Sequence, residues 1–161
     1  MLKNAIYLLF ILISYTSVSG QERSVDFGIK GGVNLTFFKV IEAGFGVNPE
    51  AEVGYYGGIF MDILIDEEFS IQPEILYIGI NDFTFLNAPI YAKYQVAQNL
   101  YILTGPSVNY FFDLFANKVK IGADIGSSYN ITQALDIHLK FALGFQEISP
   151  NGLFLGLGVK L

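Results

Sequence analysis

Alternation of apolar and polar residues constrains the fold of this chain more than any other feature. Over residues 135–145 every second residue is a large apolar one, and the residues between them are Asp, His, Lys, Ala and Gly. Side chains of a β-strand point alternately to opposite faces, so this pattern predicts a strand with one apolar and one polar face. The same alternation occurs over 27–35, 119–129 and 153–161.

Weaker alternation between these segments predicts further strands, at 53–64, 69–78, 85–94 and 100–110. Proline, which central strands disfavour, occurs inside three of them, at Pro73, Pro89 and Pro106. Turn-forming residues separate the runs, for example at Asn81-Asp82 and Pro150-Asn151-Gly152. The sum is eight antiparallel strands, each about ten residues long, which is the length that a tilted strand needs to cross a bilayer.

The volumes of the two faces indicate which one points outward. A barrel of eight strands has an interior just wide enough to be filled by side chains. The apolar face is rich in Leu, Ile, Phe and Tyr and would overfill it, whereas the other face alternates glycine with lysine, aspartate and serine. We therefore predict an all-β fold, an eight-stranded antiparallel transmembrane up-and-down β-barrel with a polar lumen. The alternative is a soluble barrel of the lipocalin type with its apolar face inside.

The N-terminus has the three parts of a secretory signal peptide, which we assign to residues 1–20. Lys3 supplies the positive charge, Ala5 to Ile13 form the apolar stretch, and Ser14 to Gly20 are small and polar. That stretch is nine residues long, against the roughly 20 that a membrane-spanning helix needs. The expected mature chain begins at Gln21, and residues 21–161 form the barrel domain. Together, signal and barrel predict the outer membrane of a Gram-negative bacterium.

With the N-terminus in the periplasm, aromatic residues are expected to gather at the two membrane interfaces. The inner set is Phe69, Tyr94 and Tyr129, and the outer set is Tyr55, Tyr77, Phe85, Tyr110 and Phe145. One outer loop, predicted at 36–52, is long, acidic and aromatic. It is the expected surface for binding another envelope protein.

Composition excludes several classes of function. The formal net charge of −6 argues against nucleic acid as a partner, because phosphates demand a basic face. The chain has no cysteine and a single histidine, so neither a thiolate metal site nor a site with several histidines is expected. No cofactor-binding or catalytic motif is present, and we predict no cofactor, no metal and no enzymatic activity.

Charged residues on the inward face are predicted to pair with one another, because isolated charges in a narrow lumen are costly. Lysines at five inward positions face an equal number of aspartates and glutamates. The predicted structural network comprises Lys30, Asp62, Glu74, Lys93, Lys120, Asp124, Asp136, His138, Lys140 and Lys160. Asp26 is the remaining acidic residue on this face.

Two other functions fit the same residues. The lumen could be a narrow channel for small solutes that the ion-pair network gates. A barrel enzyme that modifies lipids would need a nucleophile beside His138, and Ser107 or Ser128 could serve as one. No motif places either serine next to the histidine, so a non-enzymatic scaffold or binding protein is the favoured interpretation.

Five segments spread over the mature chain resemble one known family. They are 27–34, 69–77 with Gln72-Pro73-Glu74, 88–94 with Pro89 and Ala92-Lys93-Tyr94, 105–106, and 155–161. In this order they are similar to the PorT-like outer-membrane β-barrel proteins. The resemblance implies an eight-stranded barrel in contact with outer-membrane lipid and, during biogenesis, with the barrel-assembly machinery. Leu161 and Val159 stand where such chains usually carry aromatic residues.

Overall fold

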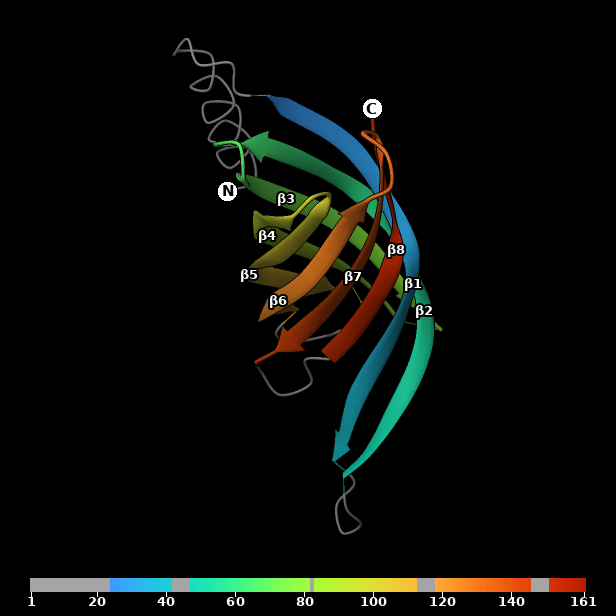
Figure 1. Cartoon of the computed structure of the whole chain (residues 1–161). Helices are drawn as coiled ribbons and strands as arrows, with labels where there is room; N and C mark the ends of the chain where they lie inside the picture. The colour runs from blue at the N-terminus through green and yellow to red at the C-terminus, as the bar shows by residue number, and fades with distance from the viewer. Residues whose placement is uncertain (1–23, 42–46, 82, 113–117, 146–150) are drawn as a thin grey trace, which may run out of the picture.

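Eight antiparallel strands form a closed barrel in the computed structural model, which describes residues 24–41, 47–81, 83–112, 118–145 and 151–161 (Figure 1). The strands are β1 (Val25–Ile41), β2 (Val47–Leu64), β3 (Phe69–Ile80), β4 (Phe83–Ala97), β5 (Leu100–Phe111), β6 (Val119–Asn130), β7 (Leu135–Gly144) and β8 (Asn151–Lys160). Each strand pairs with the next, and β8 pairs with β1 from Gly28↔Lys160 to Phe37↔Asn151. The predicted fold class is confirmed, and the predicted signal peptide, residues 1–20, lies outside the described residues.

The two ends of the barrel differ. At one end, here named the terminal end, β1 begins and β8 ends; at the other, the hairpin end, β1 ends and β2 begins (Figure 1). No helix among the described residues is long and apolar enough to cross a membrane.

The prediction of a loop over 36–52 is wrong for most of that range. β1 runs on to Ile41 and β2 begins at Val47, and the two stay paired from Phe37↔Ala51 to Ile41↔Val47. Antiparallel pairing continues because each strand supplies backbone partners for the other, whatever the side-chain pattern. The result is a two-stranded ribbon, residues 38–41 with 47–54, that projects beyond the barrel wall (Figure 1).

The three prolines lie inside strands, where each interrupts a ladder of paired residues. Pairing between β2 and β3 is interrupted at Pro73, between β3 and β4 at Pro89, and between β4 and β5 at Pro106. Proline has no N–H to donate, so a ladder bond is lost at each position. The strands continue on both sides in unchanged register, which the flanking pairs of the ladder maintain.

The apolar face points outward, as the volume argument predicts. On β7, Ile137, Leu139 and Leu143 are 40–45% exposed, whereas Asp136, His138 and Lys140 between them are buried. The other strands show the same bulky exterior: Phe27, Ile29, Ile59, Ile75, Ile121, Ile125, Leu155 and Leu157 are all exposed. A closed barrel with this exterior is built for hydrocarbon, since water would be in contact with large apolar side chains on every side.

The prediction that Phe85 lies at the outer membrane interface is wrong. It is buried inside the barrel and stacks on Phe111, with ring centroids 4.6 Å apart. From residue 85 to residue 93 of β4 the odd-numbered residues are buried, among them Phe85, Tyr91 and Lys93, so Phe85 faces the lumen. Phe69 is half-buried, and the remaining residues of the two sets point outward: Tyr55, Tyr77, Tyr94, Tyr110, Tyr129 and Phe145.

Candidate functional site in the barrel lumen

The lumen is filled by two layers of different chemistry. The ionic layer, toward the terminal end, holds the buried ion pairs. The apolar layer, toward the hairpin end, consists of Tyr56, Leu76, Ile78, Ile80, Phe85, Phe111, Ala142 and Phe154. Small residues of β8 make room for large neighbours: a side chain at Gly156 would meet the Tyr56 hydroxyl, and one at Gly158 the Asp136 carboxylate.

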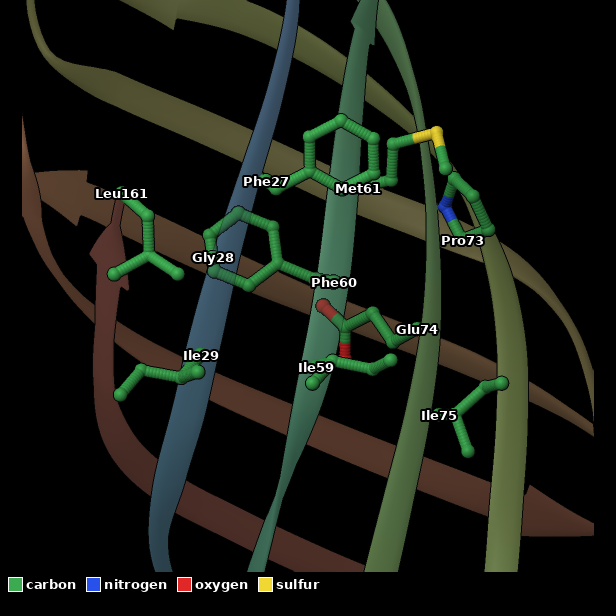
Figure 2. A pocket seen from close by; sticks show the side chains of 10 residues that line it. All are labelled: Phe27, Gly28, Ile29, Ile59, Phe60, Met61, Pro73, Glu74, Ile75 and Leu161. Atoms are coloured by element: carbon green, nitrogen blue, oxygen red, sulfur yellow. The ribbon is translucent and has the colours of Figure 1, made fainter.

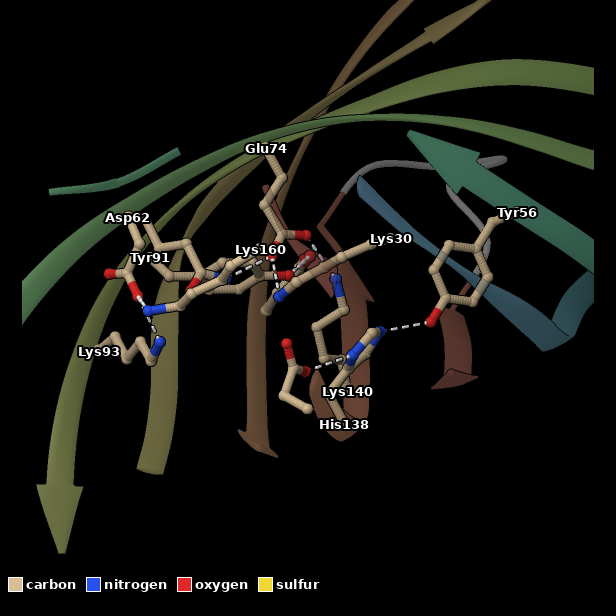
Figure 3. A network of polar contacts seen from close by, with 12 residues as sticks. Lys30, Tyr56, Asp62, Glu74, Tyr91, Lys93, His138, Lys140 and Lys160 are labelled. Atoms are coloured by element: carbon tan, nitrogen blue, oxygen red, sulfur yellow. Dashed lines mark hydrogen bonds and ion pairs between the residues drawn. The ribbon is translucent and has the colours of Figure 1, made fainter. Parts of the chain in front are cut away.

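Glu74 is the centre of the ionic layer (Figure 3). Its Oε1 accepts hydrogen bonds from Lys30 Nζ at 2.8 Å and Gln72 Nε2 at 2.7 Å, and its Oε2 accepts one from Lys140 Nζ at 2.6 Å. These side chains come from β1, β3 and β7 and are nearly inaccessible to solvent. One carboxylate on β3 therefore holds two ammonium groups, one from β1, two strands away, and one from β7, across the lumen.

A second group of ion pairs lies nearer the terminal end. Lys93 Nζ is 2.6 Å from Asp62 Oδ2, and Lys160 Nζ is 3.3 Å from the same oxygen and 2.9 Å from Asp26 Oδ2. Lys93 also lies over the ring of Tyr101, 4.7 Å from its centroid. Two lysines and two aspartates make this group neutral.

His138 is buried between two polar partners. Its Nδ1 lies 3.0 Å from Asp136 Oδ1, and its Nε2 lies 2.6 Å from the Tyr56 hydroxyl (Figure 3). A carboxylate only accepts, so the Nδ1 proton faces Asp136; in the neutral ring Nε2 then accepts the Tyr56 hydroxyl. Both ring nitrogens are thus occupied.

Six of the ten residues predicted for the network form its lysine–carboxylate pairs, Asp136 and His138 bond each other, and the remaining two stand apart. Asp124 accepts hydrogen bonds from Tyr91 (3.0 Å) and Ser107 (2.6 Å) instead of from a lysine. Lys120 is buried near the hairpin end, and no described carboxylate lies within ion-pair distance of it.

The hydroxyl and amide partners were missed in the sequence. Tyr56, Gln72, Tyr91 and Ser107 each bind a charged or titratable group of the ionic layer. The alternation of side chains along a strand could have identified them. Tyr56 is an even number of residues from Asp62 on β2, and Tyr91 is two residues from Lys93 on β4. Each tyrosine therefore lies on the same face as the charged residue and points into the lumen.

The apolar layer corrects the expectation of a lumen that is polar throughout. Ile78 and Ile80 are 0% exposed, Phe85 and Phe111 are stacked, and Tyr56 meets Phe154 edge-on at 5.3 Å. Sequence analysis missed this layer because β3 is apolar on both faces beyond Glu74, which hides the alternation. The lumen is therefore filled by ion pairs toward the terminal end and, toward the hairpin end, by packed hydrocarbon together with the buried polar residues Asn34, Thr36, Asn87, Asn109 and Lys120.

The arrangement offers no assembled nucleophile among the described residues. Ser128 pairs across from His138 on the neighbouring strand, yet the ring nitrogens bind Tyr56 and Asp136. Ser107 donates to Asp124. The described residues also contain no cluster of three or more His, Asp or Glu that could hold a metal ion.

A closed barrel of eight strands with an apolar exterior and a filled lumen defines the class of small outer-membrane-type β-barrels. Its fold is similar to a de novo designed transmembrane β-barrel, with a TM-score of 0.60 and 16% identity over 88% of this chain and 98% of that one. It is also similar to Ail of Yersinia pestis, solved with the heparin analogue sucrose octasulfate (TM-score 0.55, 10% identity, 86% and 99% covered). Neisserial surface protein A gives a TM-score of 0.51 at 14% identity, with 86% and 98% covered.

No protein-family model and no curated protein matches the chain. The similarity to solved structures supports the architecture, and the resemblance to PorT-like proteins stays a prediction.

Proposed function

We propose that this chain is a non-enzymatic outer-membrane protein that binds an envelope partner through the ribbon at the hairpin end of its barrel. The observation that carries the proposal is the ribbon itself, two strands that pair only with each other among the described residues and extend past a lumen that is filled. The apolar exterior supports a place in the membrane, and the predicted export signal supports the outer one. With the termini in the periplasm, the ribbon would extend outside the cell.

Strand edges of the ribbon suit one mode of recognition. The pairing of β1 with β8 ends at Phe37↔Asn151, and that of β2 with β3 ends at Tyr55↔Gly79. Beyond these pairs, residues 38–41 and 47–54 pair only within β1 and β2 among the residues that the structure describes. The outer edges of such a ribbon are templates for an added strand, and the eight residues of 47–54 exceed the usual strand length of about five to six. The expected partner therefore presents an extended segment.

Removal of the ribbon tests the proposal. Phe37 and Ala51 face each other in the register, so an Asn-Gly turn can join them in place of residues 38–50. We expect this variant to remain a heat-modifiable barrel while partner binding is lost. A photo-crosslinker at Val53, which is 70% exposed, should label the partner in cells, whereas one at Glu67 in the β2–β3 turn should not. Equal labelling from both sites, or a normal envelope phenotype of the shortened variant, would contradict the proposal.

A narrow channel is the second candidate, and the two filled layers argue against it. Conduction would require water to pass both the Glu74 ion pairs and the stacked Phe85 and Phe111 rings. We expect no steady conductance from the wild-type protein in planar bilayers. The conductance of the wild type is compared with that of the double variant Phe85→Ala/Phe111→Ala, which lacks the stacked pair of rings. Large steady conductance of the wild type would favour the channel instead.

A lipid-modifying enzyme is the weakest candidate. The nitrogens of His138 are occupied, and its ring is buried inside the barrel, whereas a lipid substrate would arrive from outside. The enzyme would become the favoured function if the purified barrel released acyl chains from lipid A and the His138→Gln variant did not.

A further inference from the structure

Two cavities among the described residues differ in chemistry. One lies in the wall formed by β1, β2 and β3, and Figure 2 shows that the side chains around it are almost all apolar. The other, here named the mouth cavity, lies inside the lumen at the hairpin end. It is lined by Thr36, Phe85, Asn87, Asn109, Ala142, Asn151, Gly152 and Phe154. Half of these residues carry a hydroxyl or an amide, so the mouth cavity can recognise a polar ligand.

Hydrogen bonds within the protein use the acceptor atoms of this lining and leave its donors. Asn151 Oδ1 accepts a hydrogen bond from a backbone N–H at 3.0 Å, so its NH2 group remains. Asn109 Oδ1 accepts one from Asn87 Nδ2 at 2.8 Å, which leaves the NH2 group of Asn109. Thr36 Oγ1 accepts one from Asn34 Nδ2 at 2.7 Å, and its own O–H can still donate. Among the described side chains of the lining, three donors thus stand against one acceptor, Asn87 Oδ1.

Lys120 adds a positive charge beside these donors. It is paired in register with Asn109 across β5 and β6, and it is only 7% exposed. No carboxylate of the described residues lies within ion-pair distance of it. A buried ammonium group without a counter-charge is costly. The mouth cavity therefore combines a surplus of donors with a positive charge that lacks a described partner, and an anion satisfies both.

Size and charge select among anions. The mouth cavity has a volume of about 10 Å³, which is about the space that a single water molecule needs. Sulfate and phosphate exceed this volume, and their second negative charge would have no cation beside Lys120. A water molecule has the right size but leaves the ammonium group without a counter-charge. A single-atom anion with one negative charge meets both conditions.

We propose that the mouth cavity binds one chloride ion, held by Lys120 and by the three donors of the lining. The ion neutralises the lysine and connects β1, β5, β6 and β8 across the lumen, so it stabilises the closed barrel. An ion that binds only the folded state raises the stability by mass action. This proposal goes beyond the partner-binding function and holds whether or not the ribbon binds a protein.

Unfolding in urea at several chloride concentrations tests the site. The barrel is kept in uncharged detergent micelles, and chloride replaces gluconate, which is too large for the cavity, at constant ionic strength. Above the dissociation constant of the site, the equilibrium constant of unfolding is expected to fall about tenfold for each tenfold rise in chloride. That dependence is the one expected of a single ion bound to the folded barrel.

Two variants assign this dependence to the mouth cavity. Lys120→Met removes the charge and should abolish the dependence on chloride. Asn109→Asp places a carboxylate opposite Lys120 and keeps an acceptor for Asn87. It should therefore abolish the dependence as well, while making the barrel more stable than the wild type in gluconate. Lys118→Met is the matched control, because Lys118 bonds the Phe112 carbonyl at the same end of the barrel; it should leave the dependence unchanged.

Bromide locates the ion in the wild-type protein, because its anomalous X-ray scattering distinguishes it from water. In crystals soaked with sodium bromide we expect one anomalous peak among Thr36, Asn109 and Asn151. This measurement and Asn109→Asp keep the proposal testable if Lys120→Met does not fold.

A wild-type stability that does not depend on chloride would overturn the proposal. So would a dependence that survives both Lys120→Met and Asn109→Asp, or bromide-soaked crystals without a peak in the mouth cavity. Asp113 and Glu147 belong to the segments outside the described residues. A dependence that appears only after Asp113→Asn or Glu147→Gln would identify a carboxylate of the chain as the partner of Lys120 and would equally refute the chloride ion.

Discussion

Glu74→Gln is expected to lower the free energy of unfolding by about 3–5 kcal/mol, the usual consequence of removing one member of a buried ion pair. The amide keeps the size of the side chain and one acceptor oxygen. It leaves the ammonium groups of Lys30 and Lys140, both buried, without a carboxylate. The other described acid near Lys140, Asp124, is already held by Tyr91 and Ser107.

Urea titration of the barrel in detergent micelles, followed by circular dichroism and by gel mobility, measures this loss. Glu68→Gln is the matched control, because Glu68 is exposed in the β2–β3 turn and bonds the Tyr94 hydroxyl. Adding Lys30→Met and Lys140→Met to Glu74→Gln should restore much of the stability, since no charge then remains stranded. A Glu74→Gln barrel as stable as the wild type would show that the lumen charges are solvated.

Leu139→Lys is expected to cost about 2–4 kcal/mol, because Leu139 faces lipid at the middle of β7. Leu135→Lys, on the same face at the first residue of the strand, should cost only about 0–1 kcal/mol. Refolding into lipid vesicles followed by urea titration gives both values. Equal stability of the two variants would mean that this face does not contact hydrocarbon.

The sequence predicted the fold well where the two faces of a strand differ in chemistry. β7 alternates leucine, isoleucine and phenylalanine with aspartate, histidine and lysine, so its burial pattern could be assigned from residue types alone. β3 offers no such contrast beyond Glu74, because Tyr77 points outward between the buried Leu76 and Ile78. The apolar layer stayed hidden for that reason.

Partners across the lumen could not be predicted, although the residues that face it could. Lys30 and Glu74 are 44 positions apart, and Glu74 and Lys140 are 66 apart. Barrel shear decides which of these positions meet, and shear is a property of the closed sheet. The ribbon could not be predicted for a related reason. Its two strands are held by pairing with each other and not by packing on a core.

Barrel closure has a consequence for the order of assembly. Seven of the eight strand pairings join consecutive strands, and the remaining one, β1 with β8, joins the two ends of the chain. Glu74 on β3 receives Lys30 from β1, two strands away, and Lys140 from β7, four strands away, so Lys140 gains its carboxylate only when the sheet has curled across the lumen. A partly built sheet in lipid would carry open edges and unpaired ammonium groups together. Edge pairing and the pairing of Lys140 therefore come with closure of the sheet, and intermediates with few strands have no stable place in the bilayer.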